Sequence, residues 1–330
     1  MLLRNLTSGY HTLQSQFFGK RVPLKINYIM TYRCNSRCAY CDIHKMDRTP
    51  EMSTKEAKDM IRSFRRMGAQ HITFIGGEPL LRKDFSELVS YAKQVGMLTT
   101  TSSNALLFEK DAEWLRDLDL FICCLNGPEE VHDKLRGKGS HKKIMEALST
   151  PYGRFATMIL TRQNVGYIDY VLEMAMKHGF FVNFQPAFRN ELAKVDSKGM
   201  EDMLLPKSQI NETFSYIHSK KNEGFPIVNS YAAIRQFRDH GRAHFKRCYH
   251  GQLSATVDPE GNVFRCYKFV NEKGAKNGPM YGWEKAFNSI RLSPCTTCHY
   301  GCHIEDNMLF MLKPEAVINL LRVGRIFNDG

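Results

Sequence analysis

Short apolar runs alternate with amphipathic stretches from residue 25 to residue 185. The runs are rich in β-branched and aromatic residues, which is typical of strands, and the stretches between them repeat apolar side chains at helical spacing. Strands that alternate with helices predict a parallel sheet with right-handed crossovers. The expected strands are Lys25–Met30, His71–Ile75, Leu98–Ser102, Leu120–Leu125, Phe155–Leu160 and Phe180–Gln185. The expected helices are Thr54–Met67, capped by Ser53 or Thr54, and Asp84–Val95, Lys110–Asp117, Ser140–Leu148 and Val165–His178.

Amphipathic segments also lie outside this repeat. Residues 1–20 carry apolar side chains at helical spacing, and the tail Asn307–Phe327 does so with an interruption. Both segments are expected to dock against the main domain, and contact with a membrane surface is the alternative. Pro206–Lys220 and Tyr231–Arg238 are expected to be helices that bridge the main domain to a second, smaller one.

Composition bounds the class of protein. The 330 residues are 43% hydrophobic and 24% charged, as in an ordinary globular protein, and no apolar run reaches the length of a transmembrane helix. The ten cysteines fall into groups and no signal peptide is evident, which favours reduced thiols in the cytoplasm. The net charge of +12 is dispersed and no RNA-binding motif accompanies it. We therefore expect no nucleic-acid partner, and a slight preference for an anionic or lipid-bearing substrate.

Three cysteines follow the first expected strand. They are Cys34, Cys38 and Cys41, and Tyr40 stands directly before the third. Thiolates are the usual ligands of iron–sulfur clusters, and a four-iron cluster held by three cysteines leaves one iron free for another ligand. A structural zinc site normally has four ligands in paired spacings, and a fourth local ligand is missing here. The CxxxCxxC spacing closely resembles the motif of the radical S-adenosylmethionine (SAM) enzymes.

That resemblance implies a partial (β/α)6 barrel, an α/β fold in which chemistry gathers at the carboxyl ends of the strands. After the second expected strand, Gly76, Gly77, Glu78 and Pro79 match the GGEP motif of the family. In the family this motif holds the amino group of the methionine part of SAM, whose amino and carboxylate groups chelate the free iron. The two glycines would allow the backbone to approach closely. The resemblance thus implies a SAM-binding 4Fe–4S cluster and SAM as cofactors.

Further strand ends carry polar or thiol side chains. Ser102 and Asn104 follow the third strand, and Arg162 follows the fifth, where it would take the SAM carboxylate or form a surface salt bridge. Residues 121–137 resemble a block of the SPASM-type radical SAM proteins, with Cys124 in place of a serine near the SAM ribose and Asn126 in place of an aspartate. A thiol is a poorer hydrogen-bond donor than a hydroxyl, which weakens the expected ribose contact. The sixth strand ends at residues 185 and 186, where relatives accept the adenine.

A second group of cysteines lies near the end of the chain. Cys248 and Cys266 flank an expected β-hairpin, and Cys295, Cys298 and Cys302 follow. Four thiolates suffice for zinc or for a complete second cubane, and the spacing alone leaves both open. The hairpin spacing resembles that of SPASM and twitch domains, which implies one auxiliary 4Fe–4S cluster, with Cys302 as a spare or as a competitor of Cys298. The expected division is an N-terminal extension 1–24, a barrel 25–235, a twitch-like domain 236–305 of β-hairpin and helix, and a C-terminal helix 306–330.

The resemblance also implies a mechanism. An electron from a donor such as flavodoxin or ferredoxin would cleave SAM reductively, and the 5′-deoxyadenosyl radical would take hydrogen from an unactivated C–H bond. The auxiliary cluster would assist electron transfer or a net oxidation, as in an oxidoreductase. The segment before Lys25 is too short for the leader-binding domain common in peptide-modifying relatives. The expected substrate is therefore a small molecule, sugar-like compound or lipid, with peptide or protein modification as the alternative. A non-catalytic iron–sulfur or zinc protein is a remote alternative, because it would leave the Gly76–Pro79 motif without a purpose.

Overall fold

The computed structural model describes residues 2–46, 50–188, 201–239, 242, 247–270, 272–292, 295, 297–319 and 321. Within them, the strands form one sheet of nine in the order β6-β5-β4-β3-β2-β1-β7-β8-β9. Neighbouring strands from β1 to β6 pair in parallel, which confirms the predicted alternation. The bounds of these six strands are β1 Lys25–Thr31, β2 His71–Gly76, β3 Leu98–Ser102, β4 Leu120–Cys124, β5 Phe155–Leu160 and β6 Phe181–Pro186.

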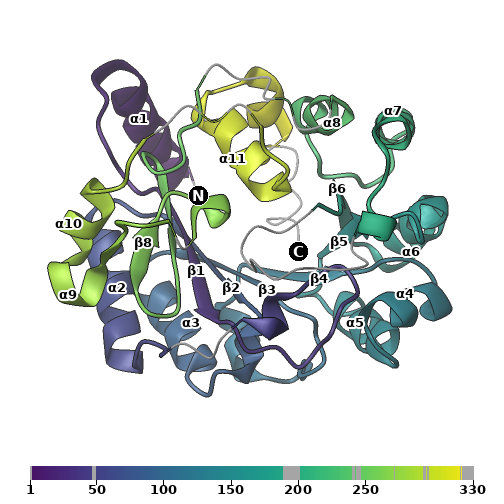
Figure 1. The fold of residues 1–330 in the computed structure, drawn as a ribbon, viewed down its shortest axis with the longest axis horizontal. Helices are drawn as coiled ribbons and strands as arrows, with labels where there is room; N and C mark the ends of the chain where they lie inside the picture. The colour runs from purple at the N-terminus through teal and green to yellow at the C-terminus, as the bar shows by residue number, and fades with distance from the viewer. Residues whose placement is uncertain are drawn as a thin grey trace.

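Helices line the outside of this curved sheet (Figure 1). Their apolar faces pack on the strands, and the resulting core includes the fully buried Tyr28, Phe74 and Phe184. Strand β1 is buried at nearly every position because helices or other elements cover both of its faces. The helices are α2 Thr54–Arg66, α3 Phe85–Gln94, α4 Glu129–Arg136, α5 Ser140–Leu148, α6 Ile168–His178, α7 Lys207–Asn222 and α8 Tyr231–Arg238.

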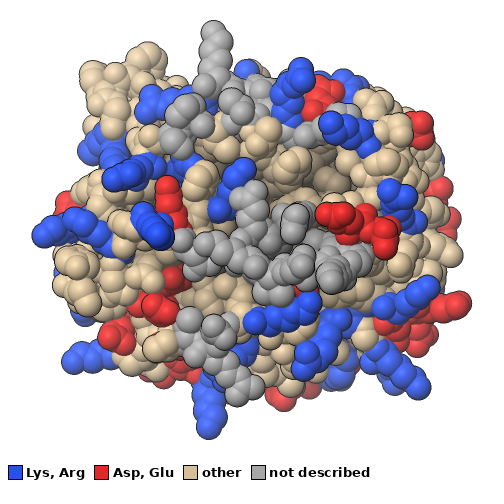
Figure 2. Space-filling view, in the orientation of Figure 1, with Lys and Arg blue, Asp and Glu red and all other residues tan. Residues whose placement is uncertain are grey.

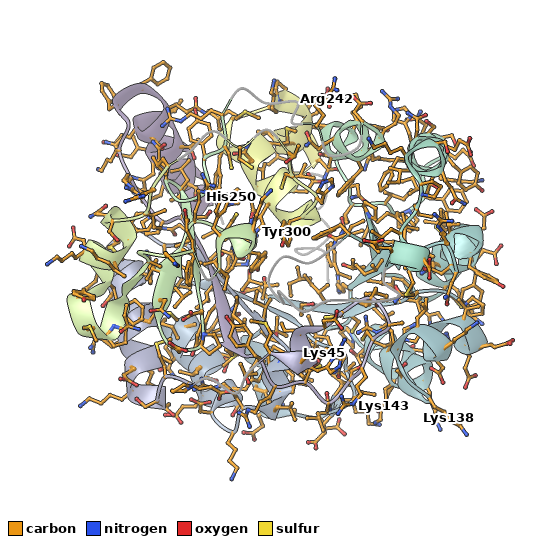
Figure 3. The ribbon with its side chains drawn as sticks, viewed as in Figure 1. Lys45, Lys138, Lys143, Arg242, His250 and Tyr300 are labelled. Carbon is orange, nitrogen blue, oxygen red and sulfur yellow. The ribbon has the colours of Figure 1, made fainter. Side chains whose placement is uncertain are left out.

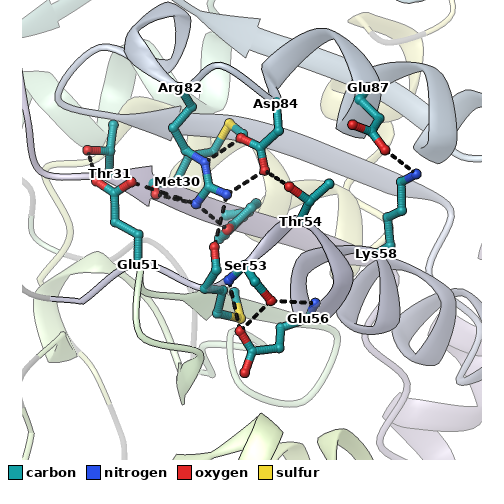
Figure 4. Close-up of polar contacts among 12 residues, drawn as sticks. Met30, Thr31, Glu51, Ser53, Thr54, Glu56, Lys58, Arg82, Asp84 and Glu87 are labelled. Carbon is teal, nitrogen blue, oxygen red and sulfur yellow. Dashed lines mark hydrogen bonds and ion pairs between the residues drawn. The ribbon is translucent and has the colours of Figure 1, made fainter.

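Local chemistry explains where α2 begins. The Ser53 hydroxyl accepts a hydrogen bond from the Glu56 backbone N–H while the Glu56 carboxylate accepts one from the Ser53 N–H. This capping box satisfies two of the free N–H groups at the helix start. It confirms Ser53 as the cap and fixes the end of the loop that leads away from the cysteines (Figure 4).

One predicted helix forms a different kind of turn, and α4 is a helix within the barrel that the sequence did not predict. The segment expected as a helix over Lys110–Asp117 forms only a 3₁₀ turn, η3 Glu113–Asp117. Its apolar residues Trp114 and Leu115 are adjacent and anchor a single turn against the core, which is too short for an α-helix. Conversely, α4 begins directly after Pro128, inside the block that the sequence marked only as a motif.

The predicted hairpin forms, and it extends the barrel sheet. Strands β7 Ser254–Val257 and β8 Asn262–Phe264 pair antiparallel, and a short β9 Lys276–Asn277 follows. Strand β7 also pairs in parallel with β1, so residues assigned to a separate small domain share a sheet with the barrel. The division into domains therefore stays a prediction. Helices α9 Gly278–Tyr281 and α10 Trp283–Asn288 come next and pack towards α2.

Two helices near the ends of the chain are joined by hydrogen bonds to the sheet or to each other. Helix α11 Gly301–Phe310 is held to β1 by an ion pair between Lys25 and Asp306 at 2.9 Å, and to β6 by the Gly301 N–H, which donates to the Gln185 side chain. Helix α1 Leu2–Phe18 is held to the end of α11 by its Gln16 side chain. No described helix is long and apolar enough to span a bilayer. Contact of the terminal segments with a membrane stays a prediction, and residues 322–327 of the expected tail helix lie outside the described residues.

Candidate functional site

The carboxyl ends of the parallel strands surround a cavity of about 270 Å³. Each of β2 to β6 contributes at least one residue to its wall, and the loop after β1 contributes the three cysteines. This is the edge at which the sequence predicted the chemistry. The predicted residues that line it are Cys34, Cys38, Tyr40, Cys41, Gly76, Gly77, Ser102, Asn104, Cys124, Gln185 and Pro186.

Helix α4 holds the cysteine loop in place. The Ser36 hydroxyl donates to the Arg136 carbonyl at 3.0 Å, and the Ala39 N–H donates to the Leu135 carbonyl at 2.8 Å. These are carbonyls of the last turn of α4, which have no partner within the helix. The loop therefore supplies hydrogen-bond partners to the last carbonyls of α4. The same bonds hold the loop between Cys34 and Cys41 in place.

The two glycines bring the loop after β2 against the start of the cysteine loop. The Gly77 N–H donates to the Thr31 carbonyl and the Glu78 N–H to the Arg33 carbonyl, both at 2.8 Å. A Cβ on Gly77 would lie 2.1 Å from the Arg33 oxygen, and one on Gly76 would lie 2.3 Å from the Thr31 oxygen. Only glycine permits this approach of two backbones. The buried Arg82 stabilises the same junction. Its guanidinium donates hydrogen bonds to the Asp84 carboxylate and to the carbonyls of Met30 and Met52 (Figure 4).

Glu78 lies beneath the cavity and does not line it. Its side chain is fully buried and accepts hydrogen bonds from the Ser103 hydroxyl at 2.8 Å, the Asn104 N–H at 2.7 Å and the Leu80 N–H at 3.1 Å. Burial raises the pKa of this carboxyl, and the three donors oppose the rise. Here the Glu78 carboxylate joins the loops after β2 and β3. Pro79 is likewise buried outside the cavity wall.

A buried hydrogen-bond network stands beside the third cysteine. The Tyr40 hydroxyl accepts from the Asn126 amide at 2.6 Å and from the Arg136 guanidinium at 2.7 Å. Asn126 is fully buried, also accepts from the Ile159 N–H, and does not line the cavity, which corrects its expected role as a direct cofactor contact. The change from aspartate to asparagine fits this position, because the amide both donates and accepts.

Sequence reasoning missed Arg136 as a site residue. Its side chain lines the cavity although the residue is 7% exposed, and no described acidic side chain forms an ion pair with it. Nearby Tyr40, Cys124 and Cys38 hold the pKa of this guanidinium above its usual range despite the cost of burial. The only signal in the sequence was its place at the end of the block after the fourth strand. A fixed cation beside Cys34 and Cys41 favours their thiolate forms, because it lowers the pKa of both thiols.

The position of Arg162 differs from the one expected for a residue that takes the SAM carboxylate. The structure places its exposed side chain outside the cavity wall, where the guanidinium Nε donates to the Leu204 carbonyl at 2.8 Å. The segment around Leu204 follows β6 in the chain and meets the β5 end through Arg162, whose backbone N–H also donates to the Met203 carbonyl at 2.9 Å. The direction of the Arg162 side chain is therefore set by a contact that the sequence near residue 162 does not reveal. Arg162 therefore does not line the cavity, and it forms no ion pair with an acidic side chain among the described residues.

The triad fits an iron–sulfur cluster in its chemistry. All three cysteines are free thiols that face one cavity. Burial raises the pKa of Cys41 to about 11 and also raises that of Cys34, while Arg136 lowers both. Buried thiols of this kind remain protonated near neutral pH until a metal displaces the proton. The donor set, the neighbouring cation and the free volume agree with the expectation.

The second cysteine group lines a smaller cavity of about 50 Å³. Cys248, Cys266, Cys295 and Cys298 all face it, whereas Cys302 does not and is exposed on the first turn of α11. This position favours Cys302 as the spare thiol over Cys302 as a competitor of Cys298. Burial raises the pKa of Cys266 to about 12, so a metal bound here would have to displace the proton of this thiol.

The distances between the sulfur atoms of the second group can be compared with those of a zinc site. Four sulfurs around one tetrahedral zinc lie about 3.8 Å apart, since each Zn–S bond is about 2.3 Å. Among the described residues, no three of these sulfurs lie within 4.8 Å of one another. In this structure the four thiols therefore do not stand at the spacing of a tetrahedral zinc site.

Phe188 separates the two cavities. It lines both of them, stacks on His299 at 5.8 Å and meets Tyr300 edge-on at 4.7 Å. His299 and Tyr300 directly follow Cys298. The residue just after β6 therefore packs against the segment that carries a second-group cysteine. Figure 3 shows Tyr300 between the sheet and α11.

Comparisons with known proteins agree with this geometry. Mycofactocin maturase MftC of Mycolicibacterium smegmatis is 26% identical over 268 residues, which cover 77% of this chain and 67% of that protein. PqqA peptide cyclase of Rhodopseudomonas palustris is 25% identical over 320 residues, which cover 87% and 81%. The crystal structure of Streptococcus suis SuiB bound to S-adenosylmethionine has a TM-score of 0.65 at 13% identity and covers 82% of this chain. The chain spans 66% of the length of SuiB, and at this identity the likeness concerns the fold alone.

A family model described as the radical SAM superfamily matches residues 28–150. This region contains the cysteine loop, the glycine pair and α4, which together build one side of the larger cavity. The chain therefore belongs to the radical SAM superfamily of enzymes, whose cofactors are a 4Fe–4S cluster and S-adenosylmethionine.

Proposed function

We propose that this radical SAM enzyme modifies a peptide. Two relatives support the proposal by their names: one is a PqqA peptide cyclase and another is a mycofactocin maturase. SuiB, which shares the fold, has also been solved bound to its precursor peptide SuiA. The expectation of a small-molecule substrate depended on the length of the segment before β1, and the start of a chain does not constrain its substrate. The relatives favour the peptide alternative.

In this proposal Cys34, Cys38 and Cys41 hold the catalytic cluster, and SAM occupies the rest of the larger cavity. Gly76 and Gly77 form the wall beside the methionine part, and Ser102, Asn104 and Cys124 line the opposite strand ends. The bound cluster supplies the electron that cleaves SAM reductively, with 5′-deoxyadenosine as product after hydrogen has left the substrate. The chain itself binds and orients the reactants and excludes water. Arg136 balances the negative charge of the thiolates.

We further propose that Cys248, Cys266, Cys295 and Cys298 hold an auxiliary 4Fe–4S cluster, as in SPASM or twitch domains. Four thiols that face one cavity support this assignment, because a complete 4Fe–4S cluster takes four thiolate ligands and no three of these described sulfurs lie within 4.8 Å of one another. Its cavity shares the wall Phe188 with the larger one, so the two clusters would stand on either side of one aromatic ring. An external donor such as flavodoxin or ferredoxin would supply the first electron. Basic side chains are spread over the molecular surface among acidic ones (Figure 2), and the net charge of +12 favours acidic partners.

The experiment is turnover by the reconstituted full-length chain. Under anaerobic conditions, SAM and a strong reductant are mixed with short peptides encoded beside its gene, and both 5′-deoxyadenosine and peptide mass are followed. We expect one of these peptides to raise 5′-deoxyadenosine release above the peptide-free rate and to change mass at one residue. A Cys34→Ala variant is the control and should do neither. Release that responds to a sugar-like compound or a lipid and to none of the peptides would contradict the proposal.

A further inference from the structure

His303 is a buried side chain without a hydrogen-bond partner. It lies on α11, is 1% exposed, and neither of its ring nitrogens has a partner in the described protein. In either tautomer one ring nitrogen carries a hydrogen and the other a lone pair. Buried polar groups in native proteins almost always find a partner, so a buried imidazole with none indicates that something absent from the polypeptide satisfies it.

The ring of His303 is held in one orientation. The His250 ring lies edge-on at 4.3 Å, the Tyr267 ring at 4.6 Å and the Tyr300 ring at 5.5 Å. Its backbone carbonyl is fixed as well, by a hydrogen bond of 2.9 Å with the His250 side chain. Three rings and one backbone contact thus position an imidazole whose nitrogens bind nothing on the chain. Figure 3 shows two of these neighbours, His250 and Tyr300, close together between the sheet and α11.

The cavity that His303 lines is the one lined by the four second-group cysteines. Sulfur atoms bound to iron accept N–H hydrogen bonds, and such bonds are among the factors that set the potential of a cluster. The cavity therefore offers His303 the partner that the polypeptide does not.

A separate metal ion is the competing explanation. Ligand atoms of His250, His303 and Asp306 lie within 4.8 Å of one another. However, both His250 nitrogens are already engaged, with the Ser254 hydroxyl at 2.6 Å and the His303 carbonyl at 2.9 Å. The ammonium of Lys25 lies 2.9 Å from the Asp306 carboxylate and supplies a cation there. A second cation would have to break these bonds and overcome repulsion by the ammonium.

We propose that His303 donates a hydrogen bond to the iron–sulfur group held by Cys248, Cys266, Cys295 and Cys298, and so sets its reduction potential. This inference rests on the auxiliary cluster proposed above. His303 acts as a positioning residue, since it tunes the group without contacting substrate. A hydrogen bond to sulfur stabilises the more negative, reduced state, so its loss should make the group harder to reduce.

The test uses the full chain with Cys34, Cys38 and Cys41 replaced by Ala, so that only the auxiliary group remains. In this background His303→Phe keeps a ring among the aromatic neighbours but removes the N–H, and His303→Gln keeps an N–H donor. Iron content is measured first, and the midpoint potential is then measured by EPR-monitored redox titration. We expect His303→Phe to shift the potential to more negative values and His303→Gln to stay nearer the parent.

The outcomes separate the two proposals. A parent that holds no iron would overturn the auxiliary cluster itself. Suppose that the parent holds four irons. An unchanged midpoint potential in His303→Phe would then overturn only the role of His303, and so would equal shifts of the potential in His303→Phe and His303→Gln. Loss of iron in His303→Phe with a native potential in His303→Gln would support it.

A second measurement uses the parent with ¹⁵N-labelled histidine. Pulsed EPR of the reduced group should detect a nitrogen coupling that disappears in His303→Phe. A coupling that persists there would assign the donor to another histidine and overturn the inference. If the parent held a metal other than iron and His303→Phe lost it, the inference would also be overturned. The separate metal ion would then be the better explanation.

Discussion

Replacement of Gly77 by alanine tests how the SAM-binding edge is assembled. A Cβ at this position would stand 2.1 Å from the Arg33 carbonyl oxygen, whereas real contacts of this kind are essentially never under 3.0 Å. One of the two backbones must therefore move by roughly 1 Å. The two hydrogen bonds of this junction, Gly77 N–H to Thr31 and Glu78 N–H to Arg33, are 2.8 Å long. A displacement of that size takes both beyond hydrogen-bonding distance.

The magnitude follows from those two bonds. Each backbone hydrogen bond contributes about 1 kcal/mol net, so we expect Gly77→Ala to lower the free energy of unfolding by about 2 kcal/mol. Because Arg33 adjoins Cys34, the same movement displaces the first cluster ligand. We expect the variant to bind less iron in the triad and to release 5′-deoxyadenosine at less than a tenth of the parent rate, which corresponds to about 1.4 kcal/mol or more.

Gly166→Ala is the matched control. No atom lies within 4 Å of the position that its Cβ would take, and its backbone is not in the left-handed region. It should therefore unfold at the parent's urea concentration or slightly above, because alanine reduces the freedom of the unfolded chain. If Gly77→Ala unfolded at the same urea concentration as Gly166→Ala and bound the full complement of iron, the argument from close backbone approach would be refuted.

Three further predictions concern the site and the helix α11 beside it. Tyr40→Phe leaves the buried donors of Asn126 and Arg136 without their shared acceptor, so the free energy of unfolding should fall by about 1–3 kcal/mol in urea titrations; an unchanged midpoint would contradict the network. Cys302→Ala should keep the EPR signal of the auxiliary cluster, since this thiol faces away from the second cavity, and loss of that signal would restore it as a ligand. Burial raises the pKa of Glu305 to about 7, so the folded state holds a proton that the unfolded chain releases near pH 4.5. Stability of the parent relative to Glu305→Gln should therefore fall as the pH rises from about 4.5 to about 7, and parallel stability curves would refute this.

The sequence predicted the features that depend on local pattern. Alternating strands and helices, a helix cap at Ser53 or Thr54 and the placement of Cys34 after β1 all follow from periodicity and short-range chemistry. Right-handed crossovers then bring the strand ends to one edge, which is why Ser102 and Cys124 were found on the same cavity.

Features that depend on distant contacts could not be predicted. Arg136 reaches Tyr40 across 96 positions of the chain, and nothing near either residue indicates the pairing. Arg162 was assigned to the cavity because it follows a strand, but its direction is set by Leu204. The spacing of the last cysteines could not tell which thiols converge, because Cys302 stays outside the wall of the second cavity although its neighbour His303 on α11 lines it. The hairpin signal gave the pairing of β7 with β8 and not that of β7 with β1.

Iron content per chain tests the central claim most directly. After anaerobic reconstitution we expect about eight irons in the parent chain, as two 4Fe–4S clusters require. About four should remain when Cys34, Cys38 and Cys41 are replaced by Ala, with no release of 5′-deoxyadenosine. About four should also remain when Cys248 and Cys266 are replaced. A parent that binds about four irons together with one zinc, or a triad replacement that leaves the iron content unchanged, would contradict the account.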